Sequence, residues 1–109
     1  MPNGWTVEVV NDLVDKELEA QPKDVRAHFL RLVNVIEGNG LVGLKEPYVK
    51  HVEGPLWEMR LKGRDGIARA IYVTAHRRRV IVLRVFTKKS EKTPRSEIEH
   101  SYRRMKEIK

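Results

Sequence analysis

Residues 56–87 read LWEMRLKGRDGIARAIYVTAHRRRVIVLRVFT, and this stretch decides the fold. It holds three strand-like segments, 56–62, 67–75 and 80–87. Gly63-Arg64-Asp65-Gly66 separates the first two, and a turn near Arg77-Arg78 separates the last two. Short segments separated by such turn residues are typical of consecutive antiparallel strands. The stretch therefore predicts a three-stranded antiparallel meander.

The two turns set the register of these strands. A two-residue turn at Arg64-Asp65 places Arg60 opposite Arg69, and a turn centred on Arg77-Arg78 places Phe86 opposite Arg69. Because side chains alternate across a strand, we expect one basic face and one apolar face on which helices can pack. The predicted basic face comprises Glu58, Arg60, Arg69, Arg84 and Phe86, and the predicted apolar face comprises Trp57, Met59, Leu61, Ala68, Ala70, Tyr72, Ile81, Leu83 and Val85.

The N-terminal third predicts a strand and two helices. Residues 6–10 alternate as a short strand, and Asn11 offers a side-chain oxygen to a helix that ends near Ala20. A longer helix begins at Pro22 and ends near the glycines at 38 and 40. Their buried stripes are expected at Leu13, Val14 and Leu18, and at Val25, Phe29, Leu32, Val33 and Ile36. His28 lies beside the second stripe and is expected to be partly buried and hydrogen-bonded.

The remaining segments complete the predicted order. Residues 41–55 contain glycines and prolines without a clear period, which predicts a loop whose Lys45, Lys50 and His51 could reach a ligand or could only solvate the loop. Thr93 and Pro94 predict an N-cap and a first-turn proline for a last helix that ends near Ile108. We therefore expect an α+β fold in the order β-α-α-β-β-β-α, with an antiparallel sheet and helices packed on one of its faces.

Positive charge is concentrated in the second half of the chain. Residues 1–55 hold six Lys/Arg and nine Asp/Glu, whereas residues 56–109 hold sixteen and six. Residues 77–92 alone carry seven Lys/Arg against one Glu, around a short apolar strand. Positive charge concentrated in one segment favours a polyanionic partner, although a solvated basic face would have the same composition.

Length and composition exclude several classes of protein. A chain of 109 residues suits a single domain, here 1–109. The absence of cysteine excludes disulfides and thiolate zinc sites, and the four histidines do not cluster, so neither a metal nor another cofactor is expected. No apolar run is long enough for a bilayer span and no secretory signal is recognisable, so we expect a cytoplasmic protein without membrane contact.

The predicted arginine cluster needs a physical reason, because like charges opposite one another destabilise a sheet. A bound polyanion supplies that reason; neutralisation by Glu58 and solvent is the alternative. Phe86 could stack on an RNA base, or it could be a partly buried aromatic at a strand end. Trp57 and Tyr72 are expected in the core.

These residues also resemble a known family. LWEMRLKGRDGIARAIYV followed by RRVIVLRVFTKKSEKTPRSEIEHSYRRMKEI resembles the RelE/HigB-type toxins of bacterial toxin-antitoxin systems, in particular the phage-derived HigB-like branch of the RelE/ParE superfamily. The shared motifs are an L-W-E-L-R-like strand, a G-x-x-R-x-x-Y strand, a strand that ends in F-x-K-K, and K-T-P before the last helix. The resemblance is strongest over residues 56–108 and implies a RelE-like microbial ribonuclease fold.

The resemblance also implies a function. It implies messenger RNA cleavage, typically on the ribosome, and neutralisation by a cognate helix-turn-helix antitoxin through which oligomers would form. By motif position the basic site residues carry over to Arg60, Arg69, Lys88 and Lys89, with Lys92 a weaker member. Leu83-Arg84 stands where the family often has leucine-histidine, which removes a candidate proton shuttle.

Cleavage by attack of the ribose 2′-hydroxyl requires proton transfer as well as charge stabilisation. Arginines hold phosphate but are too basic to take a proton, so we assign Arg60 and Arg69 to phosphate binding and Arg84 to charge stabilisation. Lys88 or Lys89 is assigned to proton transfer, with Glu58 as the alternative base. The rival hypotheses are a basic nucleic-acid-binding protein of a phage or mobile element without catalysis, and a partner-binding scaffold.

Overall fold

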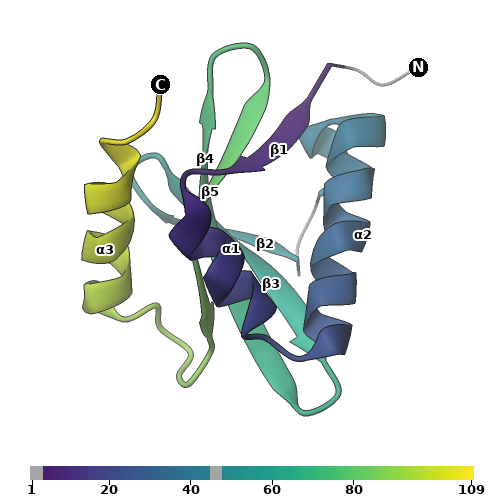
Figure 1. Ribbon diagram of the computed structural model, residues 1–109, viewed down its shortest axis with the longest axis vertical. Helices are drawn as coiled ribbons and strands as arrows, with labels where there is room; N and C mark the ends of the chain where they lie inside the picture. The colour runs from purple at the N-terminus through teal and green to yellow at the C-terminus, as the bar shows by residue number, and fades with distance from the viewer. Residues whose placement is uncertain (1–3, 45–47) are drawn as a thin grey trace.

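The computed structural model describes residues 4–44 and 48–109. Its strands form one sheet in the order β1-β5-β4-β3-β2, with α1, α2 and α3 around it (Figure 1). Strand β1 runs parallel to β5, and the other pairs are antiparallel. The α+β class is thus confirmed, with one parallel pair that was not predicted. The elements are β1 Thr6–Val9, α1 Asp12–Glu19, α2 Lys23–Asn39, the short 3-10 helix η1 Leu41–Gly43, β2 Val49–Glu53, β3 Leu56–Gly63, β4 Gly66–Ala75, β5 Arg79–Thr87 and α3 Arg95–Met105.

The predicted register of the meander is confirmed from the Arg64-Asp65 turn as far as the pair Ile71-Arg84. Arg60 pairs with Arg69, which in turn pairs with Phe86. Both Arg77 and Arg78 adopt left-handed backbone, with φ of 64° and 58°. Left-handed residues in a tight hairpin turn the chain in the sense that matches the twist of the flanking strands.

A bulge in β5 changes which residues share a face. Ile71 pairs with Arg84 but Tyr72 pairs with Val82, so Leu83 is an extra residue in its strand. Beyond the bulge, Val80 and Val82 join the face that carries Val85, whereas Ile81 and Leu83 turn to the opposite face. The prediction that Ile81 and Leu83 share a face with Val85 is therefore wrong.

Helices cover both faces of the sheet rather than the single face predicted. Helices α1 and α2 pack on one apolar cluster, and α3 packs on the other (Figure 1). The second cluster exists because the bulge adds Ile81 and Leu83 to Ile71 and Val73 on the far side. That surface would be exposed to water without α3.

The predicted loop 41–55 contains a strand. Val49–Glu53 forms β2 by pairing with β3, so the predicted order lacks one strand. Its mixed sequence gives no clear period, and its conformation depends on the backbone partner. Residues 45–47 of that predicted loop lie outside the described residues.

Several local predictions can be compared with the structure. Asn11 caps α1 through bonds to the amides of Leu13 and Val14, as predicted. His28 is buried and its Nδ1 accepts the Lys62 amide at 2.8 Å, also as predicted. Leu13 and Trp57 were expected to be buried but are 53% and 40% exposed. No helix in the described ranges combines the length and apolarity needed to cross a bilayer.

Candidate nucleic-acid interface

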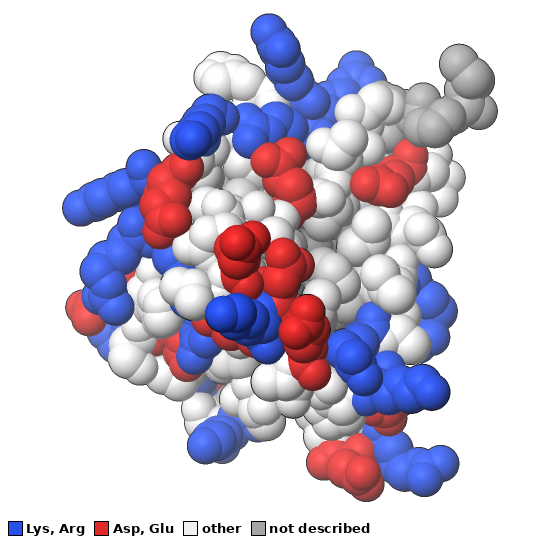
Figure 2. All heavy atoms as spheres, in the orientation of Figure 1, with Lys and Arg blue, Asp and Glu red and all other residues white. Residues whose placement is uncertain are grey.

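The surface over α1 is not the predicted basic face. In Figure 2 acidic side chains occupy the centre of this view, over α1, and basic side chains lie around them. This agrees with the sequence of α1, DLVDKELE, which has four carboxylates and one lysine. The candidate interface is on the side of the sheet that α3 covers.

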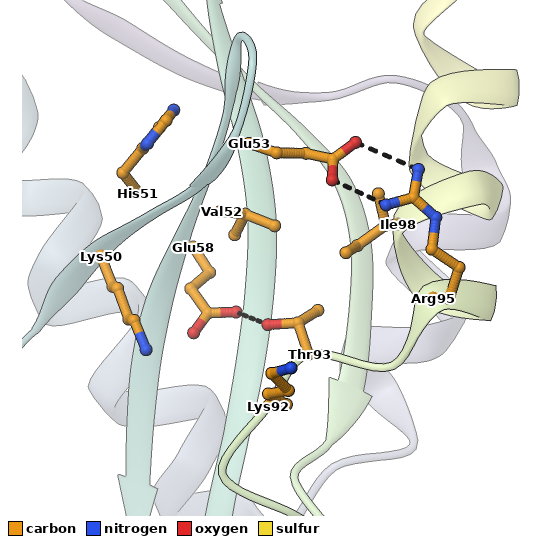
Figure 3. Close-up of a pocket in the computed structure, with 9 residues that line it drawn as sticks. All are labelled: Lys50, His51, Val52, Glu53, Glu58, Lys92, Thr93, Arg95 and Ile98. Atoms are coloured by element: carbon orange, nitrogen blue, oxygen red, sulfur yellow. Dashed lines mark hydrogen bonds and ion pairs between the residues drawn. The ribbon is translucent and has the colours of Figure 1, made fainter.

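A cavity of about 410 Å³ opens between β2, β3 and the chain that leads into α3 (Figure 3). Lys50 of β2 pairs in register with Glu58 of β3, and in Figure 3 Lys50 and Lys92 lie on either side of the Glu58 carboxylate, whereas His51 points away. Neither lysine is within ion-pair distance of a carboxylate in the described part of the chain. The lining residues are Lys50, His51, Val52, Glu53, Glu58, Lys92, Thr93, Arg95 and Ile98.

Glu58 is held inside by a hydrogen-bonded network. Its carboxylate, 1% exposed, accepts a 2.8 Å bond from the Thr93 hydroxyl and lies 3.5 Å from Arg69 Nε. The 3.5 Å contact is an ion pair and not a hydrogen bond. Thr93 had been predicted to cap the last helix, but its hydroxyl joins Glu58 to Arg69 instead, and Pro94 occupies the cap position.

Arg69 is buried rather than displayed. It is 3% exposed, and its guanidinium donates to Thr93 Oγ1 at 3.0 Å and to the carbonyl of Glu91 at 2.7 Å. A further bond of 3.3 Å reaches the carbonyl of Ser90. In this conformation Arg69 has no free donor edge that faces solvent, so its predicted phosphate-binding role stays a prediction that would require movement of the loop.

Arg84 is neutralised by two carboxylates. Its guanidinium lies 2.6 Å from Glu97 and 2.7 Å from Glu17. The hydrogen bond that Arg84 donates to Glu97 is the main reason that the pKa of Arg84 is raised above its ordinary value, and the charge of Glu17 acts in the same direction. This arginine therefore has little charge left to offer a ligand in the structure as it stands.

The other predicted residues differ in accessibility. Arg60 is half-buried, and its Nε lacks a hydrogen-bond partner among the described residues. Lys89 and Lys92 are exposed, whereas Lys88 is mostly covered and lies 3.5 Å from Glu91. Phe86 is 7% exposed and packs in the α3 cluster, so the aromatic-core alternative describes its position and it has no ring face open for a base.

The structure places Lys50 of the predicted loop in the cavity and adds Arg95, which sequence reasoning missed. Lys50 enters the cavity only because 49–53 is a strand, and Arg95 closes one side through a bidentate pair with Glu53 at 2.7 and 3.1 Å. For Lys50 the sequence left open whether its side chain reaches a ligand or only solvates the loop. Within residues 4–44 and 48–109, no cluster of three or more His, Asp or Glu could hold a metal ion.

Sequence comparison decides the family. Residues 16–106 match the family described as Phage derived protein Gp49-like (DUF891). The chain belongs to this family. No curated protein shows significant sequence similarity to this Gp49-like chain.

Structural comparison defines the fold of this Gp49-like chain. It is similar to a chain in the crystal structure of the archaeal RelE-RelB complex from Pyrococcus horikoshii OT3, with a TM-score of 0.61 and 22% identity. The match covers 77% of this chain and 94% of the archaeal one. Family and fold together confirm the RelE/HigB-type resemblance drawn from the sequence motifs.

Proposed function

We propose that this Gp49-like protein is the toxin of a toxin-antitoxin module and cleaves messenger RNA on the ribosome. The observation that carries the proposal is the cavity of the RelE-like sheet, where Lys50 and Lys92 flank the Glu58 carboxylate. Two ammonium groups beside one carboxylate provide both attraction for phosphate and groups that exchange protons.

The contacts of these side chains support a separate catalytic role for each of them. In the proposed reaction the ribose 2′-oxygen attacks the adjacent phosphorus, its proton passes to a base, and the 5′-oxygen leaves with a proton from an acid. Arg60, whose Nε has no hydrogen-bond partner among the described residues, binds the phosphate, since arginine stays charged at every relevant pH. Glu58 is the proposed base, and a lysine of the cavity or of the pair Lys88-Lys89 is the proposed acid.

The ribosome and an antitoxin are the proposed partners. Glu58 is bonded to Thr93 and Arg69, and a base held in this way depends on a substrate that is already aligned. A ribosome supplies such alignment, which makes cytoplasmic location part of the proposal. The matching archaeal chain comes from a RelE-RelB complex, and by analogy we propose a cognate antitoxin with a helix-turn-helix domain, through which oligomers form.

One comparison tests this proposal. Purified protein is incubated with a naked RNA and with the same message on stalled ribosomes, and the 5′ ends are mapped. We expect cleavage mainly on the ribosome, and a loss of about 100-fold for Glu58→Gln, the typical contribution of one acid-base group. Lys16→Ala, which removes an exposed cation of α1 far from the cavity, is the matched control. RNA binding without cleavage by the wild type would favour the non-catalytic nucleic-acid-binding alternative.

A further inference from the structure

The most buried cation of the candidate site makes its hydrogen bonds to protein, not to solvent. Arg69 stands on β4, and its two terminal nitrogens donate to Thr93, Glu91 and Ser90. A buried guanidinium needs such hydrogen bonds and an ion pair, because its removal from water costs several kcal/mol. Here they come from Glu58, from the Thr93 hydroxyl and from the backbone carbonyls of one loop.

That loop, residues 88–93, connects β5 to α3 and has no regular secondary structure (Figure 1). At its start the Lys88 amide bonds to the carbonyl of Ile67, and at its end Thr93 bonds to Glu58. Between these two points, the hydrogen bonds that join the loop to the sheet in the described structure come from Arg69. The loop carries three lysines of the candidate interface, Lys88, Lys89 and Lys92, of which Lys89 and Lys92 are exposed.

We propose that Arg69 is a positioning residue that latches residues 88–93 onto the sheet and thereby holds Lys92 at the mouth of the cavity. Its effect on RNA binding is then indirect and passes through the lysines of the loop. Glu58 and Thr93 complete the latch, since one orients the guanidinium and the other bridges the two. The consequence for RNA rests on the proposed function, whereas the consequence for the loop does not.

Limited proteolysis with trypsin tests the latch without RNA. Arg69→Ala should raise the rate of cleavage after the lysines at 88, 89 and 92 by about tenfold or more, because local opening loses charge-assisted hydrogen bonds. Cleavage in the turn at 76–78 is the internal reference and should not change. Arg60→Ala removes an arginine of the same face whose Nε has no hydrogen-bond partner among the described residues, and it should leave both rates near the wild type.

If Arg69→Ala does not fold, Arg69→Lys replaces it. This variant keeps a positive charge beside Glu58, but an ammonium group cannot reproduce the planar fork that reaches both the Thr93 hydroxyl and the carbonyls. We expect it also to expose the loop. Wild-type cleavage rates in a folded Arg69 variant would overturn the proposal.

A double-mutant cycle separates positioning from direct contact. Affinity for a single-stranded RNA oligonucleotide is measured for Arg69→Ala, Lys92→Ala and the double variant. Positioning predicts that Lys92→Ala costs much less in the Arg69 variant than in the wild type, whereas the Arg60→Ala and Lys92→Ala effects multiply. Independent effects of Arg69 and Lys92, with a salt slope lowered by about one for Arg69→Ala, would show direct phosphate contact and overturn the proposal. If the wild type binds no RNA, the proposed function fails and the trypsin experiment still decides the latch.

Discussion

The carboxylate of Glu17 on α1 lies 2.7 Å from the guanidinium of Arg104 on α3, although the residues are 87 positions apart. Together they complete the edge of β5 beyond the end of β1. Glu17 accepts the Val85 amide at 3.0 Å, and Arg104 donates to the Leu83 carbonyl at 2.8 Å. Burial acts to raise the pKa of Glu17, but the hydrogen bonds of Arg104 and Val85 and the nearby charge of Arg84 outweigh it and lower that pKa. The carboxylate is therefore ionised at neutral pH.

Removal of this carboxylate should be costly for stability. Glu17→Ala leaves Arg104 buried beside an unpaired amide of Val85, and we expect a loss of about 2–4 kcal/mol in the free energy of unfolding. Urea denaturation measures this change. Glu19→Ala removes an exposed carboxylate of the same helix and should change stability by less than about 0.5 kcal/mol. Equal effects of the two variants would show that the edge contact contributes little.

The two glycines that flank the β3-β4 turn should differ in their tolerance of a methyl group. A Cβ at Gly63 would lie 2.6 Å from Val25 Cγ2 and 2.9 Å from Asp24 Oδ1, whereas a Cβ at Gly66 meets nothing within 4 Å. Gly63→Ala should therefore destabilise the protein by about 1–3 kcal/mol through overpacking. Gly66→Ala should be close to neutral, and thermal melts of both variants check the contrast.

His28 should make stability depend on mildly acidic pH. Burial, with Arg31 and Lys62 nearby, lowers its pKa below the ordinary 6.5. Between the pKa of His28 in the folded protein and 6.5, the unfolded chain binds more protons than the folded one. The contribution of His28 to the free energy of unfolding is therefore fully present above pH 6.5 and is lost as the pH falls through the pKa of the folded state. Protonation also removes the Nδ1 acceptor of the Lys62 amide.

The measurement is urea denaturation at several pH values from neutral down to about two units below the ordinary histidine pKa. His28→Gln should flatten the pH dependence in this window, at the cost of a lower stability near neutral pH. His76→Gln, a change at an exposed turn position, should retain the wild-type slope. A His28→Gln slope equal to that of the wild type would contradict the assignment.

Phe86 should behave as a core residue. Because it packs with the apolar cluster under α3, Phe86→Ala should cost about 3–5 kcal/mol of stability. Phe86→Leu retains most of the volume and should retain RNA binding under conditions where it is folded. A stable Phe86→Leu variant that loses RNA binding would instead support stacking on a base.

The lysines that follow β5 should matter for RNA and not for stability. Lys89 is exposed, and the Glu91 partner of Lys88 is 96% exposed, so the Lys88→Ala/Lys89→Ala variant should lose less than about 1 kcal/mol of stability. Its RNA affinity should fall, and the slope of log K against log salt should decrease by up to about two phosphate contacts. Lys106→Ala/Lys109→Ala removes the same charge elsewhere and serves as the control in filter-binding titrations. An unchanged slope would remove this pair from the interface.

Local sequence was enough to predict the meander, its register as far as the pair Ile71-Arg84, and the first helix cap. These features depend on neighbours in the chain: Arg64-Asp65 closes one hairpin, Arg77 and Arg78 turn the next in left-handed backbone, and Asn11 bonds amides two and three residues ahead. Family motifs in the same stretch also identified the RelE/HigB-type relationship, and these motifs can be read from the sequence without the three-dimensional structure.

Tertiary structure decided the bulge at Leu83, the edge strand β2 and the placement of α3. None has a strong local signal, because each depends on a partner far away in the sequence. The bulge redirects Ile81 and Leu83, and this creates the second apolar face that α3 covers. Strand β2 then brings Lys50 beside Glu58, a pairing that a loop would not have produced.

Tertiary structure also decided which basic side chains remain available. The sequence predicted that Arg60, Arg69 and Arg84 share one face, and the register confirms it, but it did not show which carboxylates would meet them. Glu58 pairs with Arg69, and carboxylates from two helices pair with Arg84. A charge is neutralised or free according to what lies within a few ångströms of it, and that distance is set by the packing of segments far apart in the chain.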